Sequence, residues 1–336
     1  MFHASSPILR LLAAAFIALT APAASFITFN APNAPFTYAY RINSVGQVVG
    51  VFTTNTNPRV SYGYIRQPDG TIISILPAGA INATALAIND SGVVAGIWYG
   101  SVGHGYARDA SGNITTFDAP GATLTNPSAI NSAGTITGHY LDTQDSTRGF
   151  VRDPEGNLTT FSLPNSDLTT PTAINDAGEI AGWFFDYASR SYQSFIRDAQ
   201  GNNTIFEVPG TTMGTFAYGI NAGGEVTGYW VGSSGQPQGF VRDSSGNISV
   251  FTVSTTTGTF PYAINDAGTV AGQVAGSRFQ EGLARLASGA MLEFQVPGAG
   301  SGPFLGTTPF GINNAGMVTG WYSHPNGTVS GFIRQP

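Results

Sequence analysis

A two-part phrase recurs along the whole chain and limits what it can fold into. Its first part, Ile-Asn-x-x-Gly-x-(Val/Ile)-x-Gly, begins at steps of 42 to 48 residues. The starting residues are Ile42, Ile88, Ile130, Ile174, Ile220, Ile264 and Ile312. The second part, small-(aromatic or Leu)-x-Arg, follows about 20 residues later and ends at Arg66, Arg108, Arg152, Arg197, Arg242, Arg285 and Arg334. Repetition at a near-fixed period predicts a fold in which each copy forms one supersecondary unit and buries its apolar face against the next copy.

Each copy reads as four short strands. In one copy PTAIN at 171–175 forms the first strand, the turn 176–178 follows, and EIAGWFF at 179–185 forms the second. Gly178 suits the position in such a turn that needs a positive φ. After a loop of variable length come a third strand such as QGFVR, a tight turn, and a fourth strand such as NLTTFSLP. A four-stranded unit of about 45 residues is typical of a β-propeller blade.

The two ends of the chain complete one another in this scheme. The last copy stops at GFIRQP, after its third strand, and a matching fourth strand is found near the N-terminus as SFITFNAP, residues 25–32. Sharing one blade between the termini would remove the open sheet edges of the ring. We therefore predict an all-β fold, a single seven-bladed β-propeller of four-stranded blades over residues 25–336, closed by the N-terminal strand 25–32, which completes the last blade.

Residues 1–24 have the features of a cleaved secretory signal. Arg10 is their one cationic residue, the apolar run 11–19 follows, and small residues in an Ala-Pro-Ala pattern occupy 21–23. The run is shorter than the roughly 20 apolar residues that cross a bilayer. We expect residues 1–24 to be removed and the protein to be secreted, periplasmic or extracellular, and not embedded in a membrane. The chain has no Cys, so a packed core must stabilise it without disulfides.

The charge of the chain argues against a nucleic-acid partner. Charged residues make up 10% of the sequence, the net charge is −6, and Arg is the only cationic residue besides His. This composition offers no broad basic surface for a phosphate backbone. We also expect no cofactor, no metal ion and a monomeric protein.

The paired phrases resemble those of the HAF-repeat family of bacterial extracellular proteins, whose repeats couple an Ile-Asn-x-x-Gly phrase to a His-Ala-Phe-like one. The resemblance covers residues 25–336. Only His104-Gly105-Tyr106 comes near the tripeptide that gives the family its name, and other copies read like Gln238-Gly239-Phe240. The resemblance implies a β-propeller-type repeat fold and export, and it implies no particular activity.

Most of the repeated residues are expected to build the fold. Side chains alternate along a strand, so Arg152 shares a face with Phe150. We interpret the seven arginines as stems packed between blades, with heads bound by carbonyls or carboxylates; the alternative is a ring of seven cationic sites. Asp153 and its counterparts lack the further carboxylates of a calcium loop, and we expect them to accept backbone N–H groups within their turns. Asn175 and its counterparts are likewise expected to form turns.

Functional residues are sought where the copies differ. The position after the second Gly of the phrase varies and includes Trp183, Tyr229 and Trp321, and Tyr187 lies in a loop after a second strand. In a propeller these loops and the links between blades lie on one face, and here they are rich in aromatic residues, Asn and Thr. Rings suit the C–H faces of sugars, and amides and hydroxyls suit their hydroxyl groups. These four are candidate ligand-binding residues, although Thr, Asn and Gly also simply make loops soluble.

Arg41 breaks another column of the repeat. The residue before Ile-Asn is Ala or Gly in the other six copies and Arg41 in the first. Because the first strand of a blade is innermost, this side chain is expected to approach the central channel. Its guanidinium could bind a carboxylate or sulfate there through two hydrogen bonds, or it could reach solvent where the ring closes. Arg41 is the fifth candidate ligand-binding residue.

The sequence shows no recognisable catalytic constellation. The motifs of zinc metalloproteases, α/β-hydrolases, phosphate-binding loops and sialidase-like Asp-boxes are absent. His139, Asp142, Asp145 and Asp186 remain as candidates for a general acid and base in or beside the loops. The outer-strand phrase is roughly similar to that of virginiamycin B lyases, which are seven-bladed, but their blade signature and metal-site residues cannot be recognised.

The balance of these features favours a secreted, non-enzymatic binding protein. We predict that its loop-bearing face engages a polysaccharide or another extracellular ligand. The alternatives are a carbohydrate-active hydrolase or lyase that uses the loop carboxylates, and a protein-interaction scaffold, which would need a contiguous apolar patch on that face.

Overall fold

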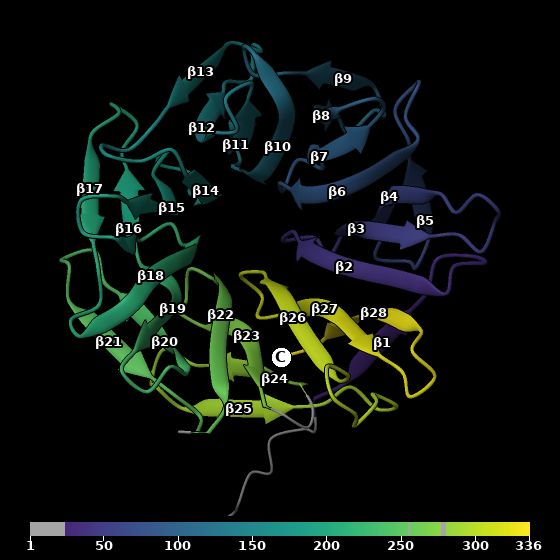
Figure 1. The fold of residues 1–336 in the computed structure, drawn as a ribbon. Coiled ribbons are helices and arrows are strands. Elements are labelled where there is room, and N and C mark those ends of the chain that lie inside the picture. Colours follow the sequence, from purple (N-terminus) through teal and green to yellow (C-terminus); the bar gives the residue numbers. More distant parts are fainter. Residues whose placement is uncertain (1–23, 255, 277–279) are drawn as a thin grey trace, which may run out of the picture.

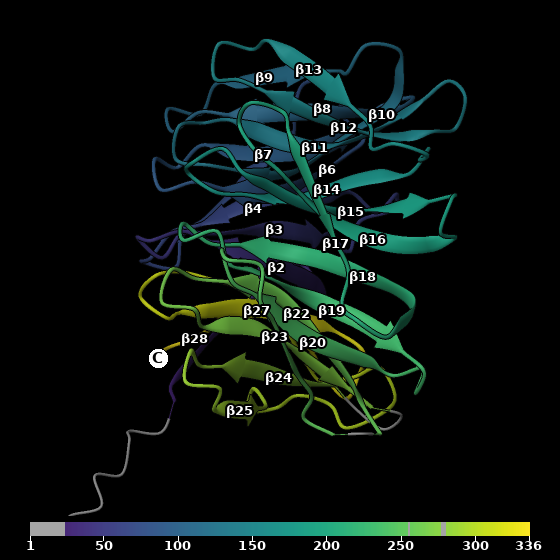
Figure 2. The same cartoon turned by 90° about the vertical axis from the view of Figure 1, so that its left-hand side faces the viewer.

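The computed structural model describes residues 24–254, 256–276 and 280–336, so the predicted signal, apart from residue 24, lies outside the described residues. The regular elements in these residues are strands, β1 to β28. They form four-stranded antiparallel units around a common centre (Figure 1). Seen from the side, the strands run across the thickness of the ring (Figure 2). The protein therefore has an all-β, propeller-like fold.

Within a unit the strands follow one another from the centre of the ring outward (Figure 1). The innermost strands are β2 (Phe36–Ile42), β6 (Asn82–Ile88), β10 (Ala122–Ile130), β14 (Thr169–Ile174), β18 (Thr211–Ile220), β22 (Gly258–Ile264) and β26 (Thr307–Ile312). The second strands are β3 (Val48–Thr53), β7 (Val94–Tyr99), β11 (Ile136–Asp142), β15 (Ile180–Asp186), β19 (Val226–Gly232), β23 (Val270–Ala275) and β27 (Val318–Ser323). The third strands are β4 (Ser61–Arg66), β8 (Gly103–Arg108), β12 (Thr147–Arg152), β16 (Ser191–Arg197), β20 (Pro237–Arg242), β24 (Gln280–Arg285) and β28 (Val329–Arg334). The outermost strands are β5 (Ile72–Ile75), β9 (Ile114–Phe117), β13 (Leu158–Phe161), β17 (Asn203–Phe206), β21 (Ile248–Phe251), β25 (Met291–Phe294) and β1 (Phe26–Phe29).

The first strand of the chain pairs with the last. β1 runs antiparallel to β28, with Phe26 opposite Arg334 and Phe29 opposite Gly331. Single parallel bridges, such as that between Phe36 and Val329, also join neighbouring units at their edges. The described strands therefore form four hydrogen-bonded sheets. Three of these sheets contain eight strands each, and one contains four.

The second glycine of the repeated phrase leaves room for a β-bulge in the innermost strand. In β2 the bulge residue is Tyr40, because Ala39 lies opposite Gly50 and Arg41 lies opposite Val49. A Cβ atom on Gly50 would run into the carbonyl oxygen of Tyr38. The same shift occurs in the other innermost strands. The seven bulge residues are Tyr40, Leu86, Ser128, Thr172, Tyr218, Tyr262 and Phe310.

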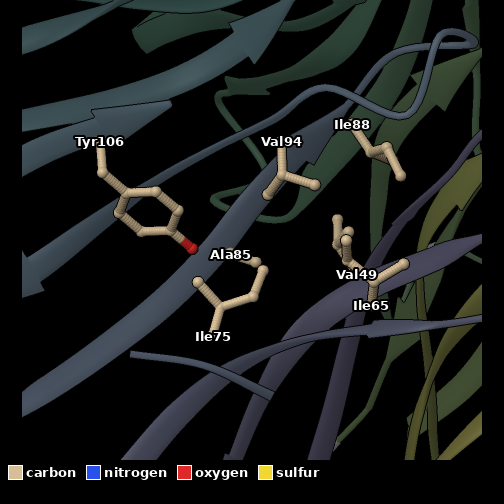
Figure 3. Close-up of a cluster of buried hydrophobic side chains, with 7 residues drawn as sticks. All are labelled: Val49, Ile65, Ile75, Ala85, Ile88, Val94 and Tyr106. Atoms are coloured by element: carbon tan, nitrogen blue, oxygen red, sulfur yellow. The ribbon is translucent and has the colours of Figure 1, made fainter. Parts of the chain in front are cut away.

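Apolar side chains pack between neighbouring units. One such cluster joins the unit β2–β5 to the unit β6–β9, and Figure 3 shows how its members converge. They are Val49, Ile65, Ile75, Ala85, Ile88, Val94 and Tyr106. The aromatic residue of the third-strand phrase is fully buried in this way, as Tyr106 and Phe150 illustrate. The phrase therefore recurs because each unit must bury the same face.

The repeated arginines are structural, as predicted, with a contact that the sequence reasoning missed. The Arg152 guanidinium stands over the ring of Phe117, in the preceding unit, 4.9 Å from its centroid. Its Nη1 donates to the Asp153 carbonyl at 3.3 Å. Arg66 stands in the same way over Phe29 of β1, also at 4.9 Å. Cation–π contacts between units are therefore made by Arg66, Arg152, Arg197, Arg242, Arg285 and Arg334.

The repeated asparagines form turns and also link the units. The Oδ1 of Asn175 accepts the Glu179 N–H at 2.9 Å, and its Nδ2 donates to the Asn221 carbonyl of the next unit at 3.1 Å. Six further bonds of this kind join Asn43 to Asn89, Asn89 to Asn131, Asn131 to Asn175, Asn221 to Asn265, Asn265 to Asn313, and Asn313 to Asn43. These seven bonds, here called the asparagine ring, return to their starting residue.

Candidate ligand-binding site

A continuous run of aromatic side chains extends around one side of the ring. Each member has a ring centroid within 4.9–6.4 Å of another member. The run, here called the aromatic arc, consists of Tyr187, Phe185, Tyr192, Trp183, Phe216, Tyr229, Tyr218, Phe260, Tyr262, Phe310, Trp321, Tyr40 and Tyr38. It starts at β15 and passes over β18, β22 and β26 to β2. The bulge residues are aromatic in β18, β22, β26 and β2, and they are Leu86, Ser128 and Thr172 in β6, β10 and β14, so the centre of the ring is asymmetric.

The four aromatic residues predicted as ligand-binding all belong to the arc. Tyr229 stacks on Phe216 at 4.9 Å, and Trp321 packs edge-on against Tyr38 of the neighbouring unit at 5.4 Å. Trp183 lies within 5.6 Å of Phe216. These three predicted residues are half-buried, so one part of each ring is exposed and the other is held in place.

Tyr187 forms the outer end of the arc. Its side chain is 55% exposed, and its hydroxyl donates to Asp167 Oδ1 at 2.7 Å. Its ring packs edge-on against Phe185 at 5.1 Å, which connects it to the rest of the arc. The arc therefore runs from an exposed tip on a loop to buried positions beside the channel.

The phenols near the channel stay protonated at ordinary pH. Burial raises the pKa of Tyr40 to about 12, with a smaller contribution from Tyr38. Burial also raises the pKa of Tyr218 and Tyr262. A neutral phenol presents an O–H donor beside an apolar ring, which is the combination that a sugar hydroxyl and its C–H face can use.

Arg41 points into the channel, as predicted. A cavity of about 160 Å³, here called the central chamber, is lined by Arg41 together with Thr172, Tyr218, Tyr262 and small or branched residues of the innermost strands. Arg41 Nη1 donates to the Phe310 carbonyl at 2.7 Å and to the Tyr40 carbonyl at 3.2 Å. Phe310 belongs to β26, so Arg41 also joins the first and last units of the chain. Because Tyr218 and Tyr262 line the chamber and belong to the arc, the chamber and the arc share a wall.

A second cavity lies next to the central chamber, at the turns that follow the innermost strands. It has a volume of about 240 Å³ and is lined by residues of the asparagine ring and by Asp90 and Asp176. Four of the isoleucines that begin the phrase, Ile88, Ile130, Ile174 and Ile312, line both cavities. An apolar collar therefore separates the polar entrance from the central chamber.

The candidate acids and bases do not come together. Asp142 pairs with Arg148 at 2.7 Å and accepts the N–H groups of Gln144 and Ser146 in its own turn. Asp186 accepts the N–H groups of Ala188 and Ser189, both at 3.1 Å. Hydrogen bonds lower the pKa of both carboxyl groups. The largest contribution comes from the Arg148 side chain for Asp142 and from the Ser189 side chain for Asp186. A general acid needs a raised pKa, so these two carboxylates are tuned in the opposite direction.

In the described residues, the other two candidates also form no side-chain pair with a second candidate. Asp145 is exposed at a turn position with φ of 59°. Its backbone N–H donates to the Asp142 carbonyl at 3.2 Å and closes their shared turn. His139 lies beside Asn126, with 3.3 Å between its Nε2 and the Asn126 Nδ2, and burial lowers its pKa to about 4. Within the described parts of the chain, no side-chain hydrogen bond or ion pair links any two of these four residues.

The described residues contain neither a candidate metal site nor a candidate membrane-spanning helix. No group of three or more His, Cys, Asp or Glu side chains in 24–254, 256–276 and 280–336 could hold a metal ion. The same stretches contain no helix with the length and apolarity needed to cross a membrane.

The sequence reasoning missed the bulge residues as site components. Tyr218 and Tyr262 line the central chamber, and Tyr262 stacks on Phe310 at 4.9 Å. The signal was present in the column two residues before the repeated Ile, which is aromatic in four copies and not in three. The meaning of this column depends on the bulge, because the extra residue lines the central chamber in β14, β18 and β22.

Comparison with known proteins supports the fold alone. No family model matches the sequence, and no curated protein sequence matches it. A solved streptogramin B lyase is similar in structure, with a TM-score of 0.59 and 15% identity over 93% of this chain and 98% of that one. A prolyl endopeptidase has a TM-score of 0.60 and 12% identity over 87% of this chain and 47% of that one. TolB from Acinetobacter baumannii has a TM-score of 0.52 and 14% identity over 73% and 62% of the two chains.

Proposed function

We propose that this chain is an exported, non-enzymatic binding protein that takes a polysaccharide on the aromatic arc. In this proposal residues 1–24 are a cleaved signal, and residues 25–336 are one seven-bladed propeller of the HAF-repeat type in which β1 completes the last blade. The pairing of β1 with β28 supports that closure, as does the bond from Asn313 back to Asn43.

The aromatic arc is the observation that carries the binding function. Isolated exposed rings are common on protein surfaces, but a continuous run on one side of the ring needs an explanation. The half-buried rings of Trp183, Tyr229 and Trp321 are fixed by their neighbours, so a ligand could bind them without a large loss of side-chain entropy. Protonated phenols of the arc would donate hydrogen bonds to sugar hydroxyls.

The state of the loop carboxylates favours binding over hydrolysis. Asp142 and Asp186 each hold their own turn through backbone N–H groups, and neither contacts the arc through a hydrogen bond in the described residues. A glycosidase needs two carboxyl groups that flank one bond, one of them with a raised pKa.

Isothermal titration with oligosaccharides chosen from a glycan array tests the proposal. We expect Trp183→Ala and Trp321→Ala each to weaken binding about ten-fold or more, because each removes a pre-positioned ring. Trp98→Ala is the matched control, since Trp98 stacks on His104 in a unit outside the arc. An array without any bound glycan, or unchanged affinity in both arc variants, would refute the proposal.

A protein partner is the second candidate, favoured by exposed apolar tips between units. Phe304, Met213 and Ile81 are 82%, 62% and 61% exposed and lie in or beside the links that lead into β26, β18 and β6. Affinity purification with wild-type protein and with a Phe304→Ser, Met213→Ser variant would separate the two functions. A partner held by the wild type and lost by the variant would favour the scaffold, and equal recovery would count against it.

A further inference from the structure

The central chamber contains an unbalanced positive charge. Among the described residues that line it, Arg41 is the sole charged one, and the equivalent positions in neighbouring innermost strands are small: Ala87, Ala129, Ala173, Gly219 and Ala263. The ion pairs in the described chain are His104 with Asp118 and Arg148 with Asp142, and none of these residues lines the chamber. Burial lowers the pKa of Arg41 only to about 10, so the guanidinium remains charged at neutral pH.

The contacts of Arg41 use one end of its guanidinium. In the described residues, Nη1 is the donor of both Arg41 hydrogen bonds. They go to the carbonyls of Phe310 and Tyr40. These carbonyls orient the group but carry no formal charge. A guanidinium has five N–H donors in a planar fork that matches a carboxylate with two parallel bonds. Joining the two units therefore needs only Nη1 and leaves the other donors for a ligand.

The surroundings of the fork indicate what kind of anion it meets. The chamber volume of about 160 Å³ leaves room for a carboxylate with several waters. Tyr218 and Tyr262 form one wall, and Tyr262 stacks on Phe310, whose carbonyl holds Arg41. A sugar ring that packs on this wall would lie in the cavity that Arg41 also lines. A carboxylate on the C5 position of that sugar is the group that we expect the guanidinium to bind.

We propose that Arg41 is the anchor of a carboxylate site in the central chamber, and that the ligand of the arc is an acidic polysaccharide containing uronate residues. This inference rests on the proposed function for its sugar component. The carboxylate site itself depends only on the chamber and on Arg41. A buried charge without a counter-ion is costly, so an anion that binds there stabilises the folded protein.

The first test compares matched oligosaccharides by isothermal titration. Oligogalacturonate should bind roughly 10- to 100-fold more tightly than a neutral galacto-oligosaccharide of the same length, as expected for charge-assisted hydrogen bonds. Arg41→Gln should remove this preference, and Arg41→Lys should retain part of it. Arg108→Gln, the same charge change at the partly exposed end of β8, is the control. Equal binding of both oligosaccharides, or a preference that survives Arg41→Gln, would overturn the inference.

The second test does not need the polysaccharide. Sodium glucuronate at constant ionic strength should raise the melting temperature of the wild type and of Arg108→Gln, relative to sodium chloride, and should not raise that of Arg41→Gln. If no oligosaccharide binds but this shift occurs, the proposed function fails and the carboxylate site stands. If oligosaccharides bind through Trp183 and Trp321 but no shift or acidic preference is seen, the carboxylate site fails and the proposed function stands. An equal shift with sodium sulfate would overturn the assignment to carboxylate. Circular dichroism verifies that Arg41→Gln is folded, and Arg41→Lys provides the comparison if it is not.

Discussion

The carbonyl oxygen of Asn43 accepts a hydrogen bond from Nδ2 of Asn313, 270 residues later in the chain, at 2.9 Å. The two residues occupy the same position of the first and last copies of the phrase. Asn313 also accepts the Met317 N–H on its Oδ1, at 2.9 Å, so a single side chain forms its own turn and joins the two ends of the repeat. A residue type that only formed a turn could be replaced by other turn formers, whereas this double role requires an amide.

Removing this amide should destabilise the whole protein. Asn313→Ala leaves the Met317 N–H without its partner and removes one of the two hydrogen bonds to the Asn43 carbonyl, which keeps the Gly46 N–H at 3.1 Å. We expect the two losses together to cost about 2–4 kcal/mol of unfolding free energy. Urea unfolding followed by fluorescence measures the loss. Asn157→Ala is the control, because Asn157 bonds Asp153 in an exposed turn and should cost less than about 1 kcal/mol. Similar losses in the two variants would contradict the special role of the asparagine ring.

The contact between Arg66 and Phe29 should couple the N-terminal strand to the first unit. The guanidinium lies 4.9 Å from the ring centroid, and Arg66 is 6% exposed. A double-mutant cycle with Arg66→Ala and Phe29→Ala should give a coupling of about 1 kcal/mol. The corresponding pair in the next unit, Arg108 and Ile75, has no aromatic ring and provides the control cycle, for which we expect a coupling near zero. Equal couplings would mean that packing alone, and not the cation–π contact, joins β1 to its neighbour.

The sequence predicted the propeller-like fold because the constraint repeats. Arg152, Asn175 and Gly178 each occur in every copy, so chance resemblance could be discarded and each residue assigned to a strand or turn. The aromatic partner of the arginine was missed because it lies in the preceding unit, about 35 residues earlier for Phe117 and Arg152. Contacts between copies depend on how units stack, and the phrase within one copy does not contain that information.

The candidate site was predictable only in part, for a related reason. Trp183, Tyr229 and Trp321 were found because their column varies, and Arg41 because it departs from Ala or Gly. The three aromatic residues join one arc through Phe216, Phe310 and Tyr38. This arrangement depends on the bulge and on the twist between units. Neither of these can be deduced from strand alternation, which would place Tyr40 and Arg41 on opposite faces.

Replacing the loop carboxylates should leave ligand binding unchanged. Asp142→Asn removes the pair with Arg148, and Asp186→Asn weakens a turn that is capped by the Ala188 and Ser189 N–H groups. Because the hydrogen bonds of these carboxylates, in the described residues, hold their own loops and do not go to the arc, we expect affinities for oligosaccharides within about two-fold of wild type. The same protein samples, incubated with polysaccharide and assayed for new reducing ends, test the enzymatic alternative. Turnover by the wild type that either variant abolishes would show that the carboxylates are catalytic.

His139 should make the protein less stable in mild acid. Burial lowers its pKa in the folded state to about 4, whereas an exposed His has a pKa of about 6.5. The unfolded chain therefore binds a proton that the folded protein excludes, and this contribution to stability is fully present above pH 6.5 and is lost as the pH falls toward 4. The shift corresponds to as much as about 3 kcal/mol over this window. Urea unfolding at pH 7, 5.5 and 4.5 should show a steeper decline for wild type than for His139→Gln, which cannot take up the proton. Parallel declines in the two proteins would mean that His139 is accessible to protons in the folded state.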